Sequence, residues 1–216
     1  LGNYTGDDYL PYSHNPSEEQ ILSDIDNLKS EVDIVIVSVH WGFEFIRYPS
    51  PRQVRLAHHM IDAGARVVLG HHPHCLQGIE EYKNALICYS LANFVFDFDM
   101  RNLRETVILQ LEFDGKDKLN YNLIPIYINR RYRPVPLKDD RRGMKILDRV
   151  RKISAGIPAS ASLRMGVYLE RVRVKQQRAR RWARLFFIIN LWRFPLRHIF
   201  QVIKRFIKRR HFCRLK

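Results

Sequence analysis

The sequence predicts an α/β domain built on a mixed sheet, followed by basic amphipathic helices. Two patterns of buried strands, with a helix between them, indicate parallel pairing in the first part of the chain. Two hairpin patterns follow and indicate antiparallel pairing. From Leu163 onward the composition changes to arginine-rich with interleaved aromatic residues, which marks a separate segment.

The first elements follow from caps and apolar spacing. Ser17 and Gln20 form a capping-box pattern before apolar residues at helical spacing, which predicts a helix of about three turns that ends near Ser30. Residues 33–39 are almost all β-branched, a pattern typical of a strand buried on both faces. His40 falls at the carboxyl end of this strand.

A second helix and strand follow at once. Ser50 and Pro51 are a cap and a proline at the first helical position, and Gly64 is a C-terminal stop. Residues 66–69 then form another buried strand pattern. Because the carboxyl ends of parallel strands lie at one edge of a sheet, we expect the two loops that follow residues 40 and 70 to lie close together.

The rest of the body is expected to be mostly antiparallel. Residues 77–82 and 85–90 flank one turn, and residues 106–113 and 119–128 flank another. A helix is predicted over residues 139–154 and is ended by Gly156 and Pro158. We therefore divide the chain into a body, residues 1–156, and a basic helical tail, residues 157–216.

Composition and charge narrow the function classes. At 46% hydrophobic and 27% charged residues, the chain is expected to be globular rather than disordered throughout. Three cysteines at irregular spacing predict neither a disulfide framework nor a zinc ribbon. The net charge of +15 lies entirely in the tail, where 17 lysines and arginines from Leu163 onward accompany one acid, Glu170.

The histidines carry the clearest chemistry. His40-Trp41-Gly42 follows the first buried strand, and Gly70-His71-His72-Pro73-His74 follows the second. Imidazole nitrogen is a common ligand of zinc and of neighbouring transition metals, so His40, His72 and His74 are candidate metal ligands. A single histidine after a strand is more often a hydrogen-bonded structural residue than a metal ligand. His58 and His59 lie in the middle of the predicted second helix, and we assign them a structural role. The sequence leaves two roles for His71: it either supports the metal ligands from behind or faces the substrate.

At these two motifs the sequence resembles the CapA family of poly-γ-glutamate capsule synthesis proteins. The resemblance runs from about residue 21 to residue 154 and covers the C-terminal half of that family's domain. It implies a calcineurin-like metallophosphatase fold, a mixed sheet sandwich. It also implies that His40, His72 and His74 hold divalent metal ions, two in the full-length protein and of the Mn, Zn or Fe kind, with His71 as a candidate catalytic residue.

The same resemblance implies a role in the synthesis or export of an anionic polymer at the bacterial cell envelope. The family also has a Gly-Asp and an Asn-Asn-His element that supply further ligands, and we find neither in residues 1–32. Two alternatives therefore stand beside it. One is a metal-dependent phosphoesterase or hydrolase of another substrate, and the other is a non-enzymatic, membrane-associated scaffold.

The tail predicts a partner of its own. Pro195 divides it into two helices, and in the second the apolar residues from Leu196 to Ile207 share one face while basic residues take the other. The longest uncharged run, residues 185–192, is too short to span a bilayer. We expect residues 163–216 to bind an anionic membrane surface or an envelope-synthesis partner protein. Nucleic acid is a disfavoured partner, because the helix face is too hydrophobic for a solvated surface that binds phosphates.

Overall fold

The described chain contains two sheets of different construction. The computed structural model describes residues 16–96, 103–115, 118–137 and 140–189, and it has the mixed α/β fold that the sequence predicts. In chain order the elements are α1 Glu18–Leu28, β1 Ile36–His40, α2 Pro51–Ala63, β2 Val67–His71, β3 Ile79–Tyr82, β4 Ala85–Cys88, β5 Glu105–Asp114, β6 Lys118–Ile128, β7 Pro134–Pro136, α3 Arg141–Ala155, α4 Ile157–Ala161 and α5 Met165–Ile189.

The first sheet has the strand order β1-β2-β4-β3, in which β1, β2 and β4 run parallel and β3 runs antiparallel to β4. The second sheet, β5-β6-β7, is antiparallel throughout. Both predicted hairpins are therefore confirmed, as β3–β4 and β5–β6. The parallel pairing of β1 with β2 across α2 is confirmed as well.

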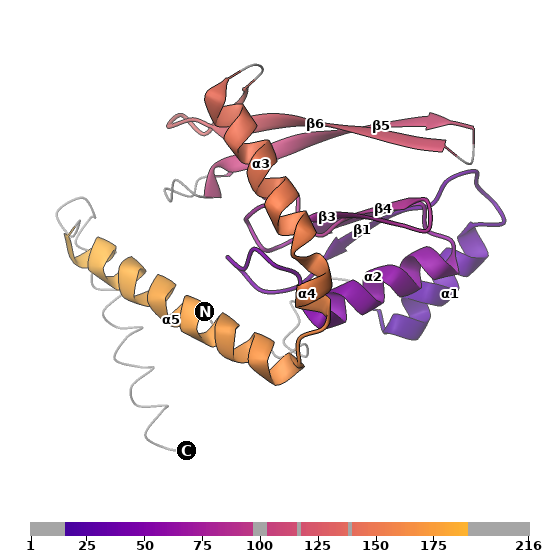
Figure 1. Cartoon of the computed structure of the whole chain (residues 1–216), viewed down its shortest axis with the longest axis horizontal. Coiled ribbons are helices and arrows are strands. Elements are labelled where there is room, and N and C mark those ends of the chain that lie inside the picture. The colour runs from indigo at the N-terminus through magenta and orange to yellow at the C-terminus, as the bar shows by residue number, and fades with distance from the viewer. Residues whose placement is uncertain (1–15, 97–102, 116–117, 138–139, 190–216) are drawn as a thin grey trace, which may run out of the picture. The chain divides into compact units, whose positions relative to one another are not determined.

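The first sheet is covered differently on its two faces (Figure 1). Helices α1, α2 and α4 pack on one face, where Met60, Val68 and Tyr89 are completely buried. On the other face, Val67 and Cys88 pack against apolar residues of the β5–β6 hairpin. Helix α3 closes a third cluster through Ile146. Alternating residues of β2 thus face two separate cores, which explains why its first three residues, Val67, Val68 and Leu69, are all apolar.

One prediction about the sheet is wrong. The first strand was expected to be buried on both faces, but alternate residues of β1 are exposed, and Ile36 exposes 47% of its surface. The reason is position: β1 is the last strand in the order of its sheet among the described residues. The residues that pack onto the β2 and β4 side from the second sheet do not cover β1. A β-branched run favours strand conformation, but it does not determine which other elements pack against the strand.

The helix caps follow the sequence closely. The Ser17 side chain accepts a hydrogen bond from the backbone N–H of Gln20, as predicted for the start of α1. Ser50 and Gln53 exchange two hydrogen bonds, at 3.1 and 2.9 Å, so that α2 begins with a complete capping box. Gly64 ends α2 at φ 126°, a backbone conformation that side chains disfavour.

The chain divides into two compact units, Leu1–Leu169 and Glu170–Lys216. The residues that follow the predicted domain boundary at 156 still pack with the first unit. Ile157 is buried in its main core, the Ser160 hydroxyl donates to the Pro49 carbonyl, and the Tyr168 hydroxyl donates to the Tyr48 carbonyl. The division at 156 itself stays a prediction.

Helix α5 supplies the first of the two predicted tail helices. Nothing among the described helices is both long enough and apolar enough to cross a membrane. The second predicted tail helix, after Pro195, lies outside the described residues.

Candidate functional site

Two histidine-bearing loops meet at the carboxyl ends of β1 and β2. His40 and His71 are direct neighbours in the parallel register of these strands. The backbone N–H of Trp41 extends the pairing by donating to the His71 carbonyl at 3.1 Å, and that of Phe45 donates to the Pro73 carbonyl at 2.8 Å. The expectation that the two loops lie close together is therefore confirmed.

The predicted ligand histidines cluster there. The ring centroids of His40 and His72 are 4.6 Å apart, and those of His72 and His74 are 5.9 Å apart. His72 and His74 have φ angles of 95° and 55°, in the left-handed region, which costs a residue with a side chain about 1–2 kcal/mol. Such strain persists only where surrounding contacts impose it, and it concentrates at functional sites.

Asn93 fixes the orientation of His74. This side chain is 6% exposed, and its Oδ1 accepts a hydrogen bond from His74 Nδ1 at 2.8 Å. Its Nδ2 donates to the carbonyls of His74 and Leu103, both at 3.3 Å. Because Nδ1 carries the proton, Nε2 is the nitrogen of the neutral ring that can accept a hydrogen bond or bind a metal.

Sequence reasoning missed the role of Asn93. Asn93 lies in the segment Ser90-Leu91-Ala92-Asn93-Phe94, 19 residues after His74. No sequence pattern links residues at that separation, so the contact could not be predicted from spacing. Ala92 adopts a φ of 64° there, with its N–H donating to the Ser90 hydroxyl. An alanine at this φ is strained. The turn places the Asn93 side-chain amide against His74 in the histidine loop.

Burial keeps several of these imidazoles uncharged. It lowers the pKa of His72 to about 4, with help from the neighbouring rings of His40 and His74. Burial and the nearby His74 and His71 lower the pKa of His40, and burial lowers that of His71. At neutral pH the three rings therefore carry lone pairs rather than charge, the state in which imidazole binds a metal or accepts a proton.

Gly70 lets the Tyr89 backbone and the Trp41 ring approach the end of β2 closely. A Cβ on this residue would stand 2.1 Å from the Tyr89 carbonyl oxygen and 2.6 Å from Trp41 Nε1. Those two atoms are themselves hydrogen-bonded, with Trp41 Nε1 donating at 3.0 Å. The Trp41 ring also stacks on that of Tyr89, with centroids 6.0 Å apart, so Trp41 is a packing residue.

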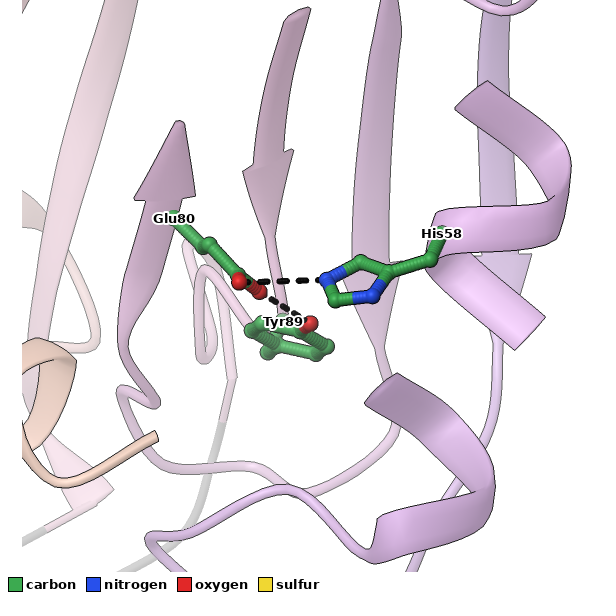
Figure 2. A network of polar contacts seen from close by, with 3 residues as sticks. All are labelled: His58, Glu80 and Tyr89. Atoms are coloured by element: carbon green, nitrogen blue, oxygen red, sulfur yellow. Dashed lines mark hydrogen bonds and ion pairs between the residues drawn. The ribbon is translucent and has the colours of Figure 1, made fainter. Parts of the chain in front are cut away.

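A second polar cluster lies on the helix-covered side of the first sheet. Figure 2 shows His58 and Tyr89 converging on the carboxylate of Glu80, at 3.1 Å and 2.6 Å. The His58 ring stacks on Tyr82, with centroids 4.0 Å apart. His59 bonds Glu18 of α1 at 2.6 Å. Both helix histidines thus have structural partners, as predicted from the sequence.

The fit of a metal ion to the described residues is incomplete. The donor type suits zinc and similar ions, and burial keeps His40 and His72 neutral. However, no three His, Cys, Asp or Glu side chains in the described part of the chain are placed to hold one ion together. These residues alone do not form a metal centre, so metal binding by His40, His72 and His74 stays a prediction.

Comparison with known proteins agrees with the motifs. A model of the family described as "Bacterial capsule synthesis protein PGA_cap" matches residues 3–98, which include the whole histidine cluster and Asn93. The chain is 40% identical over 110 residues to the capsule biosynthesis protein CapA of Bacillus anthracis, covering 51% of this chain and 27% of that protein. It is 38% identical over 135 residues to the PGA biosynthesis protein CapA of Bacillus subtilis strain 168, covering 62% and 35%.

A third relative is a probable polyglutamine synthesis accessory protein of Mycobacterium tuberculosis, 39% identical over 80 residues, which cover 37% of this chain and 20% of that protein. The chain therefore spans about a third or less of the length of these curated relatives. On these matches the resemblance seen in the sequence is confirmed: residues 3–98 match the family of bacterial capsule synthesis proteins, and the chain is similar to CapA proteins of two Bacillus species.

Proposed function

We propose that this chain serves the synthesis or export of an anionic capsule polymer of the poly-γ-glutamate kind, as part of an accessory protein of the bacterial cell envelope. The observation that carries the proposal is the identity of 38–40% to two Bacillus proteins named for capsule and PGA biosynthesis. The family match over residues 3–98 includes both histidine loops, so the resemblance extends to the residues that carry chemistry.

The experiment is deletion of the gene in the bacterium that carries it, followed by acid hydrolysis and glutamate analysis of the surface polymer. We expect the polymer to be lost and to return when the wild-type gene is supplied. A His72→Ala gene supplied in the same way tests whether the cluster takes part. An unchanged amount of polymer in the deletion strain would contradict the proposal.

The finer proposal is that the first unit is one half of a metallophosphatase-type sandwich. What supports it is the layering of helices, a mixed sheet and an antiparallel sheet, with histidines at the ends of two adjacent parallel strands. In open α/β sheets, ligands bind at this edge.

Within that proposal, His40, His72 and His74 contribute imidazole nitrogens to a divalent-metal site whose remaining donors lie beyond the described residues. A bound ion would polarise a phosphoryl or acyl group or activate water. His71 lies beside His40 in the sheet register, and the lowered pKa of both rings leaves His71 able to accept a proton. We assign it the substrate-facing, catalytic role.

Elemental analysis of the purified chain tests metal binding directly. The wild type is compared with the double variant His72→Ala/His74→Ala, and His58→Ala/His59→Ala is the matched control on α2. Near-stoichiometric metal that disappears only in the first double variant would support the site. Equal metal in all three proteins, or none in any, would overturn it for this chain.

A non-enzymatic scaffold is the second candidate, and one observation favours it. No three potential ligands among the described residues surround a common point, so these residues do not by themselves supply a three-ligand metal site. In that case the deletion strain complemented with His72→Ala would make normal amounts of polymer. An enzyme that depends on the cluster would leave the strain without polymer.

A further inference from the structure

The second unit is strongly basic, and its positive charge begins within α5. Helix α5 contains seven lysines and arginines and one acid, Glu170. No acidic residue follows Glu170 to the end of the chain. A helix of 25 residues with this excess of positive charge attracts a polyanion. The charge by itself does not identify the polyanion.

Exposed aliphatic residues distinguish among the polyanions. Val174, Leu185 and Ile188 expose 39%, 47% and 61% of their surfaces. Their spacing of eleven and three residues places them on one face of the helix, which they share with the exposed Arg181. Nucleic-acid phosphates or a soluble acidic polymer would leave these aliphatic side chains in water, whereas a lipid surface accepts both charge and apolar area.

The helix is not suited to cross the bilayer. No described helix meets the length and hydropathy that a span needs, and the apolar residues of α5 are interrupted by bases until Arg184. A surface position satisfies both sets of side chains: arginine and lysine reach lipid phosphates while the aliphatic residues enter the boundary with the acyl chains.

We propose that residues 170–189 of α5 bind an anionic phospholipid surface, with Arg171, Arg173 and Lys175 contacting lipid phosphates and Leu185 and Ile188 entering the interface. Each base near an anionic bilayer contributes electrostatic attraction that falls off with salt. This binding is independent of the capsule function proposed above, because it depends on none of the histidines.

The test uses the full chain and floated vesicles, either of phosphatidylcholine alone or of an equimolar mixture with phosphatidylglycerol. We expect binding only to the mixed vesicles. Replacing Arg171, Arg173 and Lys175 by glutamine should weaken it about a hundredfold, the combined effect of three interfacial charges. The matched control replaces Arg52, Arg55 and Lys145, which are exposed bases of the first unit. This control should stay within about twofold of the wild type, because local contact rather than net charge decides binding.

A second variant separates lipid from other polyanions. Leu185→Ser/Ile188→Ser should weaken vesicle binding about tenfold and leave retention on duplex DNA or soluble poly-glutamate unchanged. Circular dichroism establishes that each variant keeps its helix content. The proposal is overturned if the serine variant binds vesicles as well as the wild type, if both triple variants weaken binding equally, or if the chain binds DNA or poly-glutamate but not the mixed vesicles.

Discussion

Replacing Asn93 by alanine is expected to destabilise the first unit through loss of three hydrogen bonds. The Asn93 amide accepts one bond from His74 Nδ1 and donates one to each of the carbonyls of His74 and Leu103. At about 1 kcal/mol net for each bond, the free energy of unfolding falls by about 3 kcal/mol. For a domain of this size the melting temperature then falls by about 6–12 °C.

The assay is urea unfolding followed by far-UV circular dichroism, with Asn122→Ala as the matched control. Asn122 is exposed, and its Nδ2 donates one hydrogen bond, of 3.2 Å, to Gln110 Oε1. Its removal should change the free energy of unfolding by no more than about 0.5 kcal/mol. If Asn93→Ala were as stable as this control, with an unchanged denaturant slope, Asn93 would not be anchoring the loop.

Nitrogen NMR of the imidazoles provides a second measurement on the same variant. In the wild type, His74 should be fixed as the Nδ1-protonated tautomer, because Nδ1 donates to Asn93. The alanine variant should show the mixture of tautomers typical of an unconstrained ring. A His74 ring that is unconstrained already in the wild type would refute the assignment independently of stability.

The remaining predictions concern backbone space, protonation and the buried tyrosine. Gly70→Ala should cost about 1–3 kcal/mol or more, since its Cβ would meet the Tyr89 carbonyl oxygen at 2.1 Å, whereas Gly166→Ala, with open space around it, should be neutral or stabilising in thermal melts. The His72 ring should titrate near pH 4 by NMR, and stability should decline as pH falls from 6.5 toward 4, because the unfolded state, at pKa 6.5, binds the proton first. Tyr89→Phe removes the hydroxyl that donates to Glu80 and should cost about 1 kcal/mol in urea unfolding; a more stable variant would show that this bond contributes nothing.

Local sequence signals were sufficient for most elements. Caps at Ser17 and Ser50, the stop at Gly64 and the two hairpins follow from interactions within a few residues, so they can be predicted without the rest of the chain. The proximity of the two histidine loops was predictable for a related reason. Parallel strands joined by one helix must end at the same edge of the sheet.

What depends on distant residues was not predictable in this way. The exposure of β1 depends on how far the second sheet extends, and the role of Asn93 depends on a turn that brings it under His74. The constraint on Gly70 likewise comes from distant residues: the Tyr89 carbonyl, which follows β4, and the Trp41 ring of the first loop.

The sequence by itself determined most strands and helices in chain order, the histidine motifs, the resemblance to a family and the excess of positive charge in the tail. These are properties of local pattern and composition. The tertiary structure alone decided which strand is exposed, which ring is held by Asn93, and how strongly burial lowers the pKa of His72. Each of these depends on atoms that are close in space and distant in the chain, and the packing that joins them is encoded by no single segment.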